Sequence, residues 1–347
     1  MTYACQTPEE AVQNQVNIPA ELQIASIDTV VFASSIRALE VVDDSTIWWA
    51  GSAGKFGYSE DGGESWVVDS LQWDTIQPHF RSIAVTQDAV FLLSIASPTL
   101  LFRSVDKGKN WALVYEENHP DAFYDAMAFW DNQNGIAMGD PTDGCLSVIR
   151  TKNGGETWEK LSCDQLPSTE EGEAAFAASN TNIALSGQAV WLVSGGKRAR
   201  VFHSPDRGET WTVSDSPIAE GEQMTGIFSV DFYDEQRGII FGGDWNDKAL
   251  NSRNKAMSED GGQSWIPILE GAGPGYQSCV RFVPNADAQA ILSCGIPGIN
   301  YSRDGGQSWT KLNDQSWYTL RFGSSWETVW LAGNGKVGKI KWKTELE

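Results

Sequence analysis

An eight-residue sequence, SEDGGESW at residues 59–66, recurs five more times along this chain. The other copies begin at residues 104, 151, 204, 258 and 302, so successive copies start 45, 47, 53, 54 and 44 residues apart. A period of about 40–55 residues is typical of the blades of a β-propeller. Between the copies, short segments rich in β-branched and aromatic residues are bounded by Gly, Asp or Ser, which predicts four strands in each repeat. We therefore expect an all-β protein.

Each copy predicts a tight turn between the third and fourth strands of its repeat. The acidic position can accept hydrogen bonds from backbone N–H groups of the turn, and the glycines supply positive φ. The final tryptophan begins the fourth strand and can pack between neighbouring blades. A calcium site is the alternative interpretation, but the loops lack the alternating carboxylates of an EF-hand loop. The structural positions are Asp61, Asp106, Asn153, Asp206, Asp260 and Asp304, with Trp66, Trp111, Trp158, Trp211, Trp265 and Trp309.

The number of blades follows from the segments outside the repeats. Three strand-like segments, WYTLRF, TVWLAGN and GKVGKIKW, follow the last copy without a fourth. An unpaired segment, ELQIASIDTV at residues 21–30, precedes the first complete repeat. We therefore predict a single propeller over residues 21–347 with seven four-stranded antiparallel blades, in which the N-terminal strand closes the last blade and removes the open seam. Residues 1–20 would form a tail outside it.

The copies SEDGGESW, SPDRGETW and SRDGGQSW resemble the Asp-box (BNR) signature of sialidases, sortilin-type receptors and photosystem II stability/assembly factor-like propellers. From about residue 22 onwards the chain resembles the last group best, and residues 123–144 are similar to its bacterial relatives, often labelled oxidoreductase-like. The resemblance implies the propeller fold, and we expect a non-enzymatic binding or assembly role. It does not by itself specify an activity.

Arginine recurs at one position of the predicted first strands, which line the central channel. In a closed ring the four repeats that carry it are consecutive, so the guanidinium groups would gather on one side of the channel. Asp125 holds the same position in the third repeat, and Glu173 lies near it in the fourth. The planar guanidinium can hold a carboxylate or phosphate through two hydrogen bonds. We predict that the channel binds an anionic ligand or a protein partner, with pairing to local acids as the alternative; the arginines are Arg37, Arg81, Arg281 and Arg321.

A second class of function comes from the sialidases, which also bind a carboxylate with arginines on an Asp-box propeller. That resemblance would make Asp125, Glu173 and Tyr318 the catalytic groups of a glycoside hydrolase acting on acidic glycans. The family's Arg-Ile-Pro start is absent here, because Ala38 follows Arg37. The three histidines are scattered, so we expect no metal site and no other cofactor.

The charge of the chain limits its partners. The formal net charge is -21, and such an acidic surface repels nucleic acid and anionic membranes. No apolar run is long enough for a transmembrane helix. We expect a monomer that binds a protein, a small anion or an acidic glycan.

The five cysteines bear on the cellular compartment. Cys279 and Cys294 flank a predicted turn symmetrically, and Cys145 and Cys163 flank the third copy of the repeat. Opposed Cα atoms of antiparallel strands lie roughly 4.5–5.5 Å apart, which suits a disulfide. We predict both disulfides, with buried free thiols as the alternative, and hence an oxidising compartment outside the cytoplasm. Cys5, in a polar tail, would be the lipidated residue of a periplasmic or outer-membrane lipoprotein of a bacterium.

Overall fold

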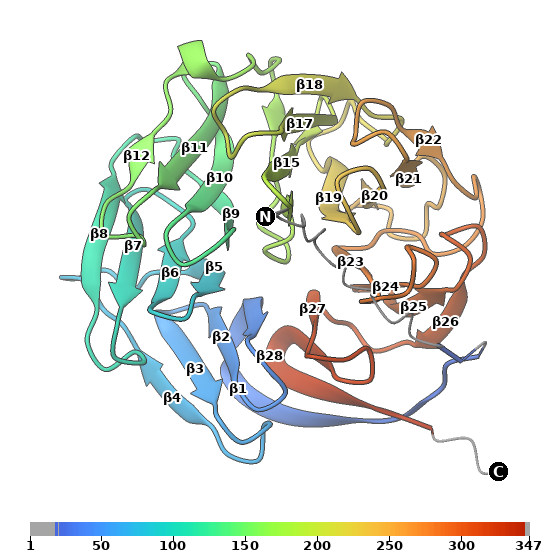
Figure 1. The fold of residues 1–347 in the computed structure, drawn as a ribbon, viewed down its shortest axis with the longest axis horizontal. Coiled ribbons are helices and arrows are strands. Elements are labelled where there is room, and N and C mark those ends of the chain that lie inside the picture. The colour runs from blue at the N-terminus through green and yellow to red at the C-terminus, as the bar shows by residue number, and fades with distance from the viewer. Residues whose placement is uncertain (1–17, 20, 344–347) are drawn as a thin grey trace, which may run out of the picture.

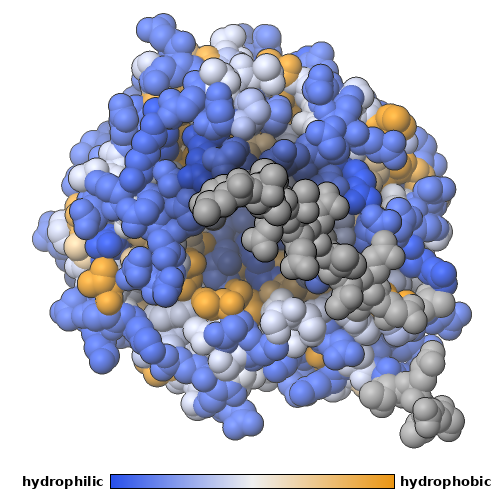
Figure 2. Space-filling model, in the orientation of Figure 1, coloured by the Kyte–Doolittle hydropathy of each residue, from blue (hydrophilic) through white to orange (hydrophobic). Residues whose placement is uncertain are grey.

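The protein consists of β-sheets arranged around a central axis (Figure 1). A computed structural model describes residues 18–19 and 21–343, and in these residues the chain forms 28 strands and one short 3-10 helix. The tail predicted at residues 1–20 therefore lies, apart from Ile18 and Pro19, outside the described residues. Figure 2 shows that the face in view is covered largely by hydrophilic side chains, in keeping with the acidic composition.

Four of the sheets contain four antiparallel strands each, in meander order except where β16 is skipped. The first consists of β5 (Phe80–Val85), β6 (Val90–Ser94), β7 (Thr99–Ser104) and β8 (Ala112–Glu117), and the second of β9 (Tyr124–Phe129), β10 (Gly135–Thr142), β11 (Cys145–Thr151) and β12 (Glu159–Lys160). The third consists of β14 (Ile183–Ser186), β15 (Ala189–Val193), β17 (Arg200–Ser204) and β18 (Thr212–Asp215), and the fourth of β23 (Cys279–Phe282), β24 (Ile291–Gly295), β25 (Gly298–Ser302) and β26 (Thr310–Asn313).

Two larger sheets have six strands each. One runs in the order β27 (Thr319–Phe322), β28 (Val329–Trp342), β1 (Ile24–Val41), β2 (Ile47–Gly51), β3 (Lys55–Ser59) and β4 (Val67–Ser70). The other runs in the order β13 (Glu173–Ala174), β16 (Gly195–Gly196), β19 (Thr225–Phe232), β20 (Gly238–Asp244), β21 (Lys255–Ser258) and β22 (Ile266–Pro267). The 3-10 helix spans Cys163–Gln165.

The prediction of seven separate blades is wrong, because the strands form six hydrogen-bonded sheets. The reason lies in β1, an 18-residue strand that is long enough to belong to both the first and the last repeat. Strand β1 pairs with β28 along its N-terminal part and with β2 along its C-terminal part, from Ile36 to Val41. The first and last repeats therefore share one continuous sheet. Within it, the N-terminal segment pairs with the end of the chain, from Ile24 opposite Trp342 to Val31 opposite Lys336.

The repeated sequence forms a turn held by its own polar groups. In the first copy the Ser59 hydroxyl donates to Asp61 Oδ1 at 2.8 Å and accepts from the Gly63 N–H at 2.9 Å. Asp61 Oδ1 also accepts from the Ser65 N–H at 2.9 Å. The hydrogen bonds, that of the Ser65 hydroxyl above all, lower the pKa of Asp61 to about 2. The other copies repeat this pattern, and Asn153 takes the acidic position in the third.

Trp111 and Trp309, which end the second and sixth copies, each pack against the preceding sheet. Trp111, which precedes β8, contacts Phe56 on β3 with ring centroids 5.2 Å apart. Trp309, which precedes β26, contacts Phe241 on β20 at 5.7 Å. These two turns therefore contact the neighbouring sheet through aromatic side chains.

A buried segment of irregular backbone, residues 175–182, fills the centre of the ring. We call it the channel segment; it connects β13 to β14 by way of the central axis. Its Asn180 side chain accepts from the Met127 N–H at 2.9 Å and donates to the Ile83 carbonyl at 3.0 Å, while the Thr181 hydroxyl donates to Ser229 at 2.8 Å. The channel is thus closed by the chain itself, which the sequence did not predict.

Candidate functional site

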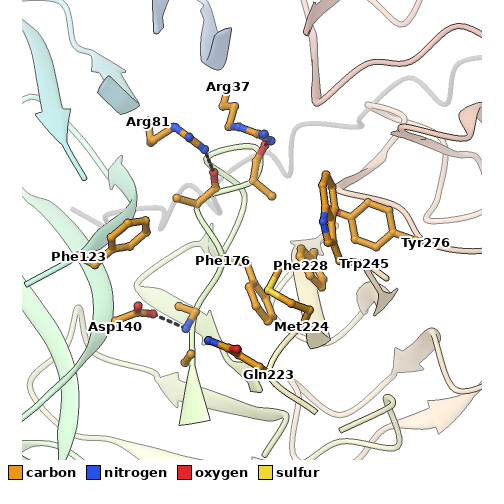
Figure 3. Close-up of a pocket in the computed structure, with 14 residues that line it drawn as sticks. Arg37, Arg81, Phe123, Asp140, Phe176, Gln223, Met224, Phe228, Trp245 and Tyr276 are labelled. Carbon is orange, nitrogen blue, oxygen red and sulfur yellow. Dashed lines mark hydrogen bonds between the residues drawn. The ribbon is translucent and has the colours of Figure 1, made fainter. Parts of the chain in front are cut away.

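A cavity of about 310 Å³ lies against the channel segment (Figure 3). Its walls come from distant parts of the chain, because the inner strands and the loops that precede or follow them meet at the central axis. Strand β1 supplies Arg37, β5 supplies Arg81 and β10 supplies Asp140. The other lining residues are Phe123, residues 174–178, Gln223, Met224, Phe228, Trp245 and Tyr276.

Arg37 and Arg81 lie side by side at one end of this cavity (Figure 3). Arg37 donates to the Ala178 carbonyl at 3.3 Å and stacks on the Tyr318 ring, 3.8 Å from its centroid. Arg81 donates to the Ala177 carbonyl at 3.0 Å. Burial lowers the pKa of both side chains, that of Arg81 to about 10. Each guanidinium has one hydrogen bond to the channel segment, so most of its donors are unused within the described part of the chain.

Arg281 and Arg321 have different surroundings. Arg281 forms an ion pair with Asp231 at 2.8 Å, and Arg321 lies 3.7 Å from Glu40. Arg321 also donates to the Asn180 carbonyl at 3.1 Å. The structure therefore brings all four predicted arginines towards the centre but divides them. Arg281 and Arg321 pair with carboxylates of the protein, whereas Arg37 and Arg81 have no carboxylate partner in the described residues.

Aromatic side chains form a second wall of the cavity. Phe176 of the channel segment stacks on Phe228 with ring centroids 3.9 Å apart. Tyr276 packs edge-on against Phe228 at 4.8 Å, and Trp245 packs edge-on against Tyr276 at 5.4 Å. These residues lie in the channel segment, on β19 and in the loops around β20 and β23. The repeat pattern did not predict this wall, because its residues lie outside the repeated turns and differ from one repeat to the next.

Two carboxyl groups lie near Arg81. Asp125 is fully buried, and neither of its oxygens has a hydrogen bond. Burial first, and the neighbouring Asp140 second, raise the pKa of Asp125 far above its usual range, against the opposing effect of Arg81. Burial thus favours the neutral form of Asp125, and no ion pair joins it to Arg81 within the described residues. It is not among the residues that line the cavity, so the structure separates it from the ligand-binding position predicted for it.

The residues of the glycosidase interpretation are not gathered in one place. Tyr318 stacks on Arg37, as described above, but Glu173 belongs to a buried ion pair with Arg200, with Oε2 2.5 Å from the guanidinium. The Ser194 hydroxyl and the Glu170 N–H also donate to the Glu173 carboxylate. Both oxygens of Glu173 are therefore engaged in holding the fold.

The cysteine predictions divide into one disulfide and one correction. Cys145 and Cys163 form a disulfide with Cα atoms 5.4 Å apart, as predicted. Cys279 and Cys294 do lie opposite each other on β23 and β24, but they are free and buried. The Cys279 thiol also lies 3.8 Å from the Leu320 carbonyl on the adjacent β27. Cys5 lies outside the described residues. Among those residues, no helix is long and apolar enough to cross a membrane.

Comparisons with known proteins agree with the fold. The family described as BNR/Asp-box repeat matches residues 301–311, which contain the last copy of the repeated sequence. No curated protein matches the chain in sequence. The fold is that of a β-propeller, and its repeated turns resemble the BNR/Asp-box repeat.

Among solved structures the chain resembles YCF48 bound to D1 peptide, with 15% identity and a TM-score of 0.67 over 92% of this chain and 99% of that one. It also resembles YCF48 from Cyanidioschyzon merolae, with 14% identity and a TM-score of 0.63 over 91% and 98% of the two chains. The WD40 propeller domain of Doa1 has 13% identity and a TM-score of 0.62 over 92% and 97%. These likenesses concern the fold, and they confirm the resemblance inferred from the repeated turns.

Proposed function

We propose that this propeller is a binding protein rather than an enzyme, and that its cavity holds the anionic group of a protein partner or a small ligand against Arg37 and Arg81. One observation carries the proposal: two adjacent guanidinium groups line a cavity without a carboxylate partner among the described residues. Partly buried cations are normally paired, and a planar guanidinium is suited to a carboxylate.

The rest of the cavity suits a ligand with an apolar part. A volume of about 310 Å³ lies at the lower end of the range for small-molecule sites, roughly 300–1,000 Å³. The stacked Phe176 and Phe228 offer an aromatic surface beside the two arginines. A carboxylate attached to an apolar side chain would satisfy both walls.

A protein partner could present such a group. One of the solved propellers that this chain resembles is described as bound to a peptide, which supports a peptide as the source of the carboxylate. The disulfide between Cys145 and Cys163 fits an oxidising compartment. We further propose that the protein acts in the periplasm or as a lipoprotein of the outer membrane.

The test is calorimetric titration with 3-phenylpropionate and with its uncharged amide. We expect saturable binding of the acid and at least about 10-fold weaker binding of the amide, since a hydrogen bond to a charged group contributes roughly 1.5–3 kcal/mol. Arg37→Gln and Arg81→Gln should each weaken binding of the acid similarly. Arg303→Gln, at an exposed arginine, is the matched control and should leave it unchanged. Equal affinity for acid and amide would overturn the proposal.

A further inference from the structure

The cavity has a negative pole as well as a positive one. Asp140 lies across the cavity from Arg37 and Arg81 (Figure 3). Its Oδ1 accepts from the Ala175 N–H at 2.7 Å, while its Oδ2 has no hydrogen bond within the described residues. No basic side chain forms an ion pair with Asp140 in this part of the chain. A cavity with separated, unpaired charges of opposite sign favours a ligand that carries both charges.

A second cavity of about 470 Å³ adjoins the first and shares Phe123, Asp140 and Ala174 with it. Asp121 also lines this second cavity, as does Glu173, whose charge is paired with Arg200, and no basic residue lines it. The charge of the lining therefore changes from positive at the arginines to negative at and beyond Asp140. An elongated ligand would be oriented with its anionic end at the arginines and its cationic end at Asp140.

The groups packed around Asp140 leave its charge available. The pKa of Asp125, on β9, is raised by burial, and Glu173 is paired with Arg200. Arg81, on β5, is held by the Ala177 carbonyl at the other end of the cavity. Burial raises the pKa of Asp140 to about 6, and only the hydrogen bond from Ala175 opposes this effect. At pH 7 the side chain is thus mostly ionised and has no cation of the protein beside it.

The size of the cavity sets the length of the ligand. A volume of about 310 Å³, at the lower end of the range for small-molecule sites, suits a ligand of only two or three residues. A single amino acid has its two charges too close together to reach both ends. The C-terminal residues of a long chain would place a neutral peptide N–H, and not an ammonium group, beside Asp140.

We propose that the ligand of this cavity is a short free peptide of two or three residues with an apolar side chain, whose carboxylate lies at Arg37 and Arg81 and whose terminal ammonium lies at Asp140. The inference rests on the proposed function, which requires only the carboxylate. It adds the ligand class and assigns Asp140 the role of selecting a free amino terminus.

Calorimetric titration of the full chain with three peptides separates these claims. The peptides are alanyl-phenylalanine, its N-acetyl derivative, which lacks the ammonium, and its C-terminal amide, which lacks the carboxylate. We expect the acetylated and amidated peptides to bind at least about 10-fold more weakly than the free one. Asp140→Asn should bring the free and acetylated peptides within about twofold of each other. Asp88→Asn, at an exposed residue, is the matched control.

The outcomes are distinct. Equal affinity of wild type for the free and acetylated peptides, or no saturable binding of the free peptide, would overturn the inference. In the first case the arginines would still bind a carboxylate, and the C-terminus of a protein partner would supply that carboxylate. Equal affinity for the free and amidated peptides would overturn the proposed function itself. A pH series gives a further readout: the advantage of the free over the acetylated peptide should disappear as the pH falls through about 6, since Asp140 then becomes neutral.

Discussion

Replacing Glu173 with alanine should destabilise the protein strongly, although the sequence offered this residue as a catalytic group. Its carboxylate accepts from Arg200 Nε at 3.1 Å and Nη2 at 2.5 Å, and from the Glu170 N–H at 2.9 Å. The Glu173 side chain is fully buried, and that of Arg200 is 10% exposed. Removing the carboxylate leaves the guanidinium buried without its counter-ion, which costs about 3–5 kcal/mol. Urea denaturation measures this loss as a lower midpoint at constant slope.

A double-mutant cycle separates the free-energy cost of the unpaired Arg200 charge from the other effects of the substitution. Glu173→Ala combined with Arg200→Met should be less destabilised than the sum of the two single variants, because the second change removes the unpaired cation. A loss of less than about 1 kcal/mol in Glu173→Ala, or strict additivity in the double variant, would refute the reasoning.

Three further predictions concern the cysteines and the buried acid. Replacing both Cys145 and Cys163 with serine should lower the free energy of unfolding by about 3 kcal/mol, since the bond joins residues 18 positions apart; a reductant should then lower the melting temperature of the wild type alone. Cys279 and Cys294 are buried, so both should react with a thiol reagent only after denaturation, and reaction in the native state would contradict this burial. Asp125→Asn should stabilise the protein at pH 7, because the raised pKa of the folded carboxyl means that stability is lost as pH rises above the ordinary value of 3.8. Denaturation curves should show this gain disappearing below about pH 4, and a gain independent of pH would count against it.

The repeated turn could be predicted from the sequence because its hydrogen bonds are local. Asp61 bonds only to residues within four positions of itself, so the eight-letter pattern contains the whole structure of the turn. The number of sheets could not be predicted in the same way. It depends on how far β1 and β28 continue their pairing across the junction of the first and last repeats, and no residue within one repeat specifies this.

The spacing of the repeats does not mark the channel segment. The third and fourth copies, on either side of it, begin 53 residues apart, but the fourth and fifth copies begin 54 residues apart without such a segment between them. The position of the channel segment depends on distant partners, since Arg321 reaches Asn180 across 141 positions of the chain. The same is true of the aromatic wall, where Phe176 meets Phe228 only after the ring has closed.

The most direct measurement of the central claim is a crystal structure of the protein grown with a saturating carboxylate ligand, with 3-phenylpropionate as the simplest choice. The account predicts density for the ligand in the cavity beside the channel segment, with its carboxylate within hydrogen-bonding distance, roughly 2.7–3.2 Å, of Arg37 and Arg81. Ligand density at Arg281 and Arg321, or only at the outer surface of the ring, would contradict it.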